Sequence, residues 1–148
     1  MRLLFSLLVL IVFASGAASA QTPGVVYKSP TCGCCEKWVN HMQQAGFSLS
    51  PKDMGTSQLM RQKLKLGITA PQASCHTAEI GGYVIEGHVP ADDVRRLLAE
   101  RPDAVGLALP DMPSGSPGME AGDVKEPFDV LLVKRDGSTE VFAKHGRP

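Results

Sequence analysis

The feature that most constrains this chain is a cluster of three cysteines, Cys32, Cys34 and Cys35, placed between a strand pattern and a helix pattern. Residues 25–27 form a short β-branched and aromatic run, and apolar residues then recur at helical spacing from Cys35 to Met42. A helix N-terminus presents unpaired N–H groups and partial positive charge, which stabilise thiolates. We therefore predict a strand–turn–helix corner whose cysteines are reactive or bind metal.

The rest of the hydrophobic pattern extends this corner into an α/β domain. The predicted elements that follow are an edge strand at 47–50, a helix from Thr56 or Ser57 to Gly67, strands at 75–80 and 83–89 around Gly81-Gly82, and a helix between Pro90 and Pro102. The predicted order is β-α-β-α-β-β-α.

The C-terminal third has a different character. Residues 109–126 are rich in Pro, Gly and Ser, and loops of this length are usually functional or disordered. Strand patterns at 130–133 and 140–142 surround Asp136-Gly137, which predicts an added β-hairpin that extends the sheet or covers an edge.

The N-terminus reads as a secretory signal. Arg2 precedes an apolar run over residues 3–14, and Ala18-Ser19-Ala20 before Gln21 fits a cleavage site. The run is too short to span a bilayer, so we expect no stable membrane insertion after cleavage. The predicted organisation is a signal peptide over 1–20 and a single domain over 21–148, exported to a compartment where disulfides can persist.

The charge balance bears on the partners of this domain. The chain has 15 basic and 15 acidic side chains, whereas phosphate binding requires a clear basic excess. We therefore expect no nucleic-acid partner.

Three hypotheses account for the cysteines. Four cysteines in an exported chain can form structural disulfides in three pairings. Cys32 and Cys35 can form the C-x-x-C pair of a thiol-disulfide oxidoreductase, as catalytic nucleophile and resolving thiol. In the third, Cys75 joins Cys32, Cys34 and Cys35 in a soft-metal site.

The metal hypothesis is favoured by the positions of Cys34 and Cys75. In a dithiol redox cycle Cys34 would be a competing thiol that traps wrong disulfides. The strand that begins at Cys75 is expected to run beside the first strand, which brings this thiol to the corner. Adjacent Cys34 and Cys35 suit a single tetrahedral zinc poorly, whereas thiolates can bridge several Cu(I) ions. Copper is therefore the predicted metal.

Four further side chains are candidate secondary copper ligands. Met112 and Met119 lie in the Pro/Gly-rich loop, where soft thioethers could shield or feed the site, or simply pack on an apolar surface. His76 should point away from Cys75 across its strand, and His88 could equally be an exposed turn residue. Both histidines are weaker candidates than the thiolates.

Four sequence motifs follow one another along the chain: YKSPTCGCCEKW at 27–38, ASCHTA at 73–78, GGYVIEGHVP at 81–90 and LPDMPSGSPGME at 109–120. They resemble the CopG-type copper-resistance family of exported bacterial proteins, over nearly all of the mature chain. The resemblance implies a thioredoxin-like fold, a periplasmic location, and copper bound by Cys32, Cys34, Cys35 and Cys75.

The function expected from the sequence is therefore copper tolerance, through a thiolate-bridged multinuclear Cu(I) site. The expected partners are copper ions and other exported copper-handling proteins. The sequence leaves open whether copper is stored, relayed or cycled between oxidation states by a copper oxidoreductase. Thiol-disulfide exchange through Cys32 and Cys35 is the alternative.

Overall fold

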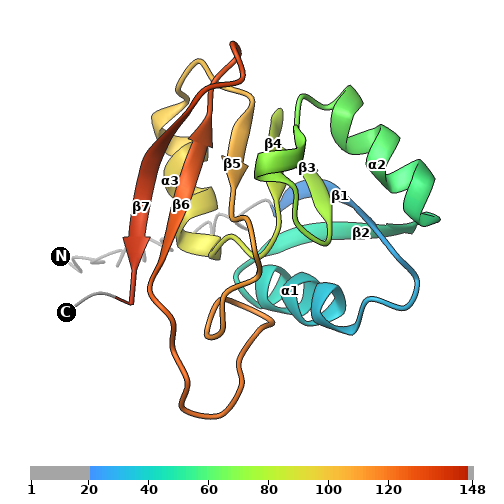
Figure 1. Cartoon of the computed structure of the whole chain (residues 1–148), viewed down its shortest axis with the longest axis vertical. Helices are drawn as coiled ribbons and strands as arrows, with labels where there is room; N and C mark the ends of the chain where they lie inside the picture. Colours follow the sequence, from blue (N-terminus) through green and yellow to red (C-terminus); the bar gives the residue numbers. More distant parts are fainter. Residues whose placement is uncertain (1–20, 147–148) are drawn as a thin grey trace, which may run out of the picture.

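The computed structural model describes residues 21–146, which form one seven-stranded sheet with three α-helices (Figure 1). The signal-peptide prediction falls on residues outside this range. The elements in chain order are β1 (Thr22–Lys28), α1 (Gly33–Gln44), β2 (Phe47–Asp53), α2 (Thr56–Lys65), the short 3-10 helix η1 (Ala70–Gln72), β3 (Thr77–Ile80), β4 (Tyr83–Glu86), α3 (Ala91–Glu100), β5 (Gly106–Ala108), β6 (Phe128–Val133) and β7 (Thr139–His145).

The first four strands form the predicted thioredoxin-like core. The sheet order is β2-β1-β3-β4-β5-β6-β7, with β1 parallel to β2 and antiparallel to β3. Strands β3 and β4 form a hairpin around Gly81-Gly82, in which Ile80 pairs with Tyr83. This order confirms the expectation that the strand after Cys75 runs beside the first strand, and that 47–50 lies in an edge strand.

The predicted C-terminal hairpin is present, but it joins the sheet through a strand that the sequence pattern did not reveal. Strand β5 pairs parallel to β4 on one side and antiparallel to β6 on the other. A Cβ atom added to Gly106 would lie 1.7 Å from the Val84 carbonyl oxygen, so the backbones approach closely there. Three residues are too few for an alternating pattern, and their pairing depends on distant segments.

The sheet carries apolar side chains on both faces. The larger cluster includes Trp38 and Met42 from α1 and Val94 and Leu97 from α3. A smaller cluster around Ile68, Val84, Ala108 and Val133 lies apart from it. The described residues contain no helix long and apolar enough to cross a membrane.

Two of the strand boundaries that differ from the prediction place functional candidates outside the sheet ladder. Strand β3 begins at Thr77 instead of Cys75, and β4 ends at Glu86 instead of Val89. Gly87 adopts a φ of +75°, which turns the chain away from the ladder. Cys75, His76 and His88 therefore lie where the chain enters and leaves the β3–β4 hairpin.

Candidate metal centre

The three clustered cysteines lie at the N-terminus of α1, as the sequence predicts. Cys32 immediately precedes the helix, and Cys34 and Cys35 belong to its first turn. The Cys32 N–H donates to the Ser29 carbonyl oxygen at 3.2 Å, which closes the turn from β1 into the helix. Cys35 is fully buried, whereas Cys32 and Cys34 are partly accessible. The corner thus combines one core sulfur with two nearer the surface.

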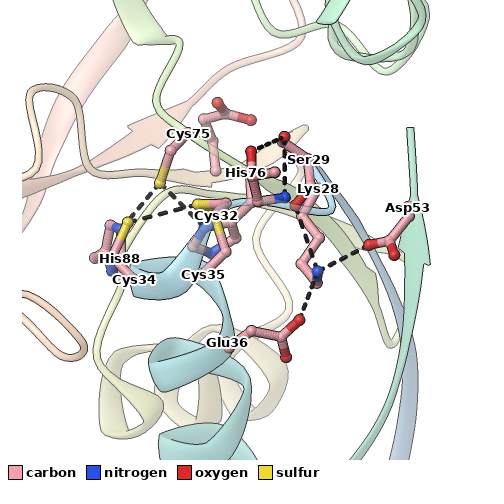
Figure 2. Close-up of a disulfide and its surroundings, with 12 residues drawn as sticks. Lys28, Ser29, Cys32, Cys34, Cys35, Glu36, Asp53, Cys75, His76 and His88 are labelled. Carbon is pink, nitrogen blue, oxygen red and sulfur yellow. Dashed lines mark hydrogen bonds and ion pairs between the residues drawn. A yellow bond between two sulfur atoms is a disulfide. The ribbon is translucent and has the colours of Figure 1, made fainter. Parts of the chain in front are cut away.

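A buried lysine fixes this corner to the sheet. Lys28 ends β1, and its ammonium lies 2.5 Å from the Glu36 carboxylate in the first turn of α1 and 2.8 Å from that of Asp53 at the end of β2 (Figure 2). The hydrogen bonds to Asp53 and Glu36 raise the pKa of Lys28 against the opposing effect of burial. The first turn of α1 is therefore tied to the ends of two strands.

The fourth cysteine reaches the cluster from the segment before β3. The sulfurs of Cys32, Cys34, Cys35 and Cys75 all lie within 4.8 Å of one another. Cys32 and Cys35 are joined by a disulfide, and Cys34 and Cys75 are free thiols (Figure 2). Burial, followed by the neighbouring Cys34, raises the pKa of the Cys75 thiol to about 12. Metal binding at Cys75 would therefore have to displace a tightly held proton.

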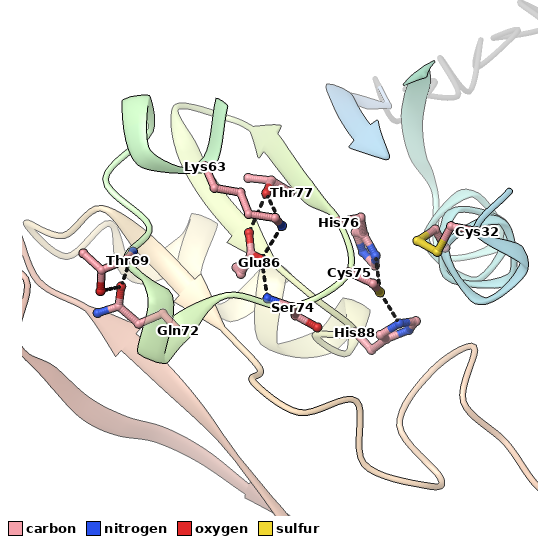
Figure 3. Close-up of polar contacts among 11 residues, drawn as sticks. Cys32, Lys63, Thr69, Gln72, Ser74, Cys75, His76, Thr77, Glu86 and His88 are labelled. Carbon is pink, nitrogen blue, oxygen red and sulfur yellow. Dashed lines mark hydrogen bonds and ion pairs between the residues drawn. A yellow bond between two sulfur atoms is a disulfide. The ribbon is translucent and has the colours of Figure 1, made fainter. Parts of the chain in front are cut away.

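His88 faces Cys75 and is fully buried, so the alternative of an exposed turn residue is wrong. Its Nε2 lies 3.0 Å from the Cys75 sulfur (Figure 3), and its Nδ1 lies 2.7 Å from the Pro117 carbonyl oxygen. A carbonyl can only accept, so in the neutral ring Nδ1 carries the hydrogen and the Nε2 lone pair faces Cys75. In this arrangement Nε2 can accept a hydrogen bond from the Cys75 thiol or bind a metal.

His76 also lies beside Cys75 instead of pointing away from it. Its Nδ1 is 3.4 Å from the Cys75 sulfur, and its ring packs 4.4 Å from the Trp38 ring centroid and 5.0 Å from that of His88. The Nε2 of His76 is buried and has no hydrogen-bond partner among the described residues. Burial, together with the charges of His88 and Lys63, holds the pKa of His76 well below its ordinary value. Cys75, His76 and His88 thus form a second donor group that shares one sulfur with the first.

The Pro/Gly-rich loop passes over the α1 corner. A Cβ atom added to Gly118 would lie 2.8 Å from the Cys34 carbonyl oxygen and 2.9 Å from the Trp38 backbone nitrogen. Met119 directly follows Gly118, so its backbone lies next to the centre, whereas Met112 is 38% exposed. Of the two methionines that are candidate secondary ligands, Met119 therefore has its backbone nearer to the cysteines.

The buried histidines predict acid sensitivity of the metal-free protein. Burial lowers the pKa of both His76 and His88, so below about pH 6.5 the unfolded chain binds more protons than the folded one. Their contribution to the free energy of unfolding is present above that pH and is lost as the pH falls, at up to about 1.4 kcal/mol per pH unit for each histidine. Chemical denaturation at pH 7.5, 6.5 and 5.5 measures the free energy of unfolding. As the pH falls, this free energy should decrease less in His88→Gln than in the wild-type protein. Equal pH slopes in the two proteins would argue against a neutral, buried His88.

Comparison with known proteins agrees with this geometry. Residues 72–119 match a family model described as a protein of unknown function, DUF411. No curated protein matches the chain. Two solved structures, described as copper resistance protein copG in form 1 and form 2, share 38% sequence identity with it at TM-scores of 0.79 and 0.78.

These matches extend over almost the whole described part of the chain. They cover 86% and 85% of this chain, respectively, and 99% of each copG chain. The chain belongs to the CopG family of copper resistance proteins.

Proposed function

We propose that this protein binds Cu(I) in a multinuclear site bridged by the thiolates of Cys32, Cys34, Cys35 and Cys75, and so contributes to copper tolerance. The observation that carries the proposal is the convergence of four sulfurs within 4.8 Å from two separate segments. Soft sulfur donors favour Cu(I) over harder metals. Adjacent Cys34 and Cys35 suit bridging between ions better than chelation of one tetrahedral zinc.

The four-thiolate site requires the Cys32–Cys35 disulfide to be reduced. That bond also gives the protein a route for copper redox cycling as a copper oxidoreductase. Two Cu(II) ions can accept one electron each from the Cys32 and Cys35 thiolates, which yields two Cu(I) ions and the disulfide. An external thiol reductant would restore the dithiol by forming its own disulfide.

Secondary ligands would complete the site on the side of Cys75. The Nε2 of His88 lies 3.0 Å from this sulfur with its lone pair directed toward it, and the His76 ring supplies a second nitrogen at 3.4 Å. Met119, and less directly Met112, would offer a thioether from the covering loop. Of these, His88 has the geometry closest to that of a ligand.

The place of action that we propose is the periplasm, after cleavage behind Ala20. Residues 21–148 would then act as one copper-binding domain, with copper ions as cargo. Delivery and removal would involve other exported copper-handling proteins.

The covering loop should slow the loss of bound copper. Gly118→Ala places a methyl group against the backbone of Cys34 and Trp38, and overpacking of this kind typically costs about 1–3 kcal/mol. Because 1.4 kcal/mol corresponds to a factor of ten, we expect a Cu(I) chelator to remove copper roughly ten times faster from this variant. Stopped-flow chelator transfer measures the rate. Gly122→Ala is the matched control, since Gly122 also has a positive φ but has open space around its Cβ position; equal rates in both variants would contradict the covering role.

A second candidate function is thiol-disulfide exchange, favoured by the Cys32–Cys35 disulfide itself. In this reaction the Cys32 thiolate attacks a partner disulfide, and Cys35 resolves the mixed disulfide to release the partner as a dithiol. Cys34 and Cys75 would have no required role in that cycle.

Anaerobic Cu(I) titration of the reduced protein tests the leading proposal. We expect more than one Cu(I) per chain, and protection of all four thiols from alkylation until a Cu(I) chelator is added. Uptake of a single zinc without excess copper would contradict it.

A further inference from the structure

A buried ion pair lies beside the segment that carries Cys75 (Figure 3). The Lys63 ammonium nitrogen is 2.5 Å from Glu86 Oε1, and the two side chains are 4% and 0% exposed. Lys63 belongs to the last turn of α2, and Glu86 is the last residue of β4. Neither residue is a copper ligand in the proposed function.

The Glu86 carboxylate holds the backbone on both sides of Cys75. The Ser74 N–H donates to Oε1 at 2.6 Å, and the Thr77 hydroxyl donates to Oε2 at 2.5 Å. The Lys63 ammonium donates to the Thr77 hydroxyl oxygen at 2.9 Å as well as to the carboxylate. The segment that carries Cys75 is therefore anchored at the residue before it and two residues after it.

The residue after Glu86 anchors the same segment a second time. The Gly87 N–H donates to the His76 carbonyl oxygen at 3.0 Å. A Cβ atom on Gly87 would lie 2.7 Å from the Ser74 Cβ and 2.5 Å from the Leu109 carbonyl oxygen. The backbone at Gly87 therefore packs closely against the segment that contains Ser74. Glu86 thus joins the segment that carries Cys75 to the end of β4, two residues before His88.

Stability alone is a poor explanation for this ion pair. Removing two charges from water is costly, and replacing a buried pair by apolar side chains of similar volume is often neutral or stabilising. What an apolar pair could not supply is an acceptor for the Ser74 N–H. The acceptor fixes the backbone next to Cys75, and Cys75 is the one proposed thiolate ligand that comes from outside the α1 corner.

We propose that Glu86, held in place by Lys63, is a positioning residue that sets the location of the Cys75 sulfur relative to the other three. The inference rests on the proposed copper site. Loss of a hydrogen-bond partner behind a metal ligand typically weakens metal binding about 10-fold to 100-fold.

Two double variants isolate the hydrogen bond from the charge. K63M/E86Q and K63M/E86L both remove the ion pair, but only the glutamine keeps an oxygen that can accept the Ser74 N–H. By chelator competition, we expect K63M/E86L to bind Cu(I) about 10-fold to 100-fold more weakly than wild type. K63M/E86Q should stay within about threefold of wild type, since its acceptor is retained. Equal affinities in the two double variants would overturn the positioning role.

Two controls separate positioning from loss of stability. Leu97→Ala removes buried volume from α3 and destabilises the fold while leaving Glu86 intact, so its copper affinity should match wild type. If Leu97→Ala lowered the Cu(I) affinity as much as K63M/E86L does, the inference would be overturned. If K63M/E86L does not fold, K63M/E86I takes its place, because a β-branched side chain suits the end of a strand.

A measurement without copper keeps this inference distinct from the proposed function. With Cys32, Cys34 and Cys35 replaced by serine, Cys75 is the only thiol, and its alkylation rate in the folded, metal-free protein reports its placement. We expect faster alkylation with K63M/E86L than with K63M/E86Q in this background. Equal rates would overturn the positioning role even if wild type binds copper. Failure of wild type to bind copper would overturn the proposed function, while the alkylation comparison would still test where Glu86 holds Cys75.

Discussion

Replacing Cys75 with serine should lower Cu(I) affinity by more than the roughly 100-fold that loss of an outer hydrogen-bond partner typically costs. A hydroxyl is close in size to a thiol but is too hard a donor for Cu(I). Cys75 is also the sulfur at which the cysteine group and the histidine pair meet, so its loss removes the link between them. Chelator competition on the reduced protein gives the affinity, and circular dichroism shows whether the fold is kept.

Gly33→Ala is the matched control for this prediction. Gly33 lies inside the cysteine motif, and a Cβ atom there would meet nothing within 4 Å, so copper affinity should be unchanged. Unchanged copper stoichiometry and affinity in Cys75→Ser would mean that the copper site is confined to the segment from Cys32 to Cys35.

Replacing Cys34 with serine should damage copper binding about as much as replacing Cys32. Both thiolates act as bridging ligands in the proposed site, so loss of either should reduce the number of Cu(I) ions bound per chain. Thiol-disulfide exchange predicts a different pattern, because Cys34 lies outside the Cys32–Cys35 disulfide and would be dispensable. Copper stoichiometry and the rate of reduction of a model disulfide, measured on both variants, separate the two functions.

One combination of results would favour thiol-disulfide exchange over copper binding as the function of the protein. In it, metal-free protein reduces the model disulfide at a rate typical of thioredoxin-like enzymes, and Cys34→Ser leaves that rate unchanged. Cys32 would then be the nucleophile and Cys35 the resolving thiol.

The local parts of the fold were predictable because their signals are local. Apolar spacing after Cys35 gave α1, and Gly81-Gly82 gave the β3–β4 hairpin. Strand β5 was missed because three residues carry no periodicity and are held by pairing with β4 and β6. A strand of that length is defined by its neighbours.

His88 could have been placed from the sequence by extending the hairpin register. In that register Thr77 pairs with Glu86, so Cys75 and His88 each lie two residues beyond the same pair, in the segments that continue β3 and β4 past the end of the ladder. Treating Gly87-His88 as an independent turn hid this relation. The register therefore offers a direct route from the motif to the histidine.

Lys63 and Glu86 carried no such signal. Charged residues are usually exposed, so a lysine on α2 and a glutamate at the end of β4 read as surface positions. Their burial depends on α2 packing next to the entrance of β3, which is a property of the tertiary structure. The supporting contacts of the site therefore emerged only from the fold, although its four cysteines were evident in the sequence.

The most direct test of the copper site is X-ray absorption at the copper edge of anaerobically loaded protein. A thiolate-bridged multinuclear site predicts sulfur ligation together with copper–copper scattering, with more than one copper per chain. A spectrum of a single copper with no copper neighbour, at one ion per chain, would contradict it.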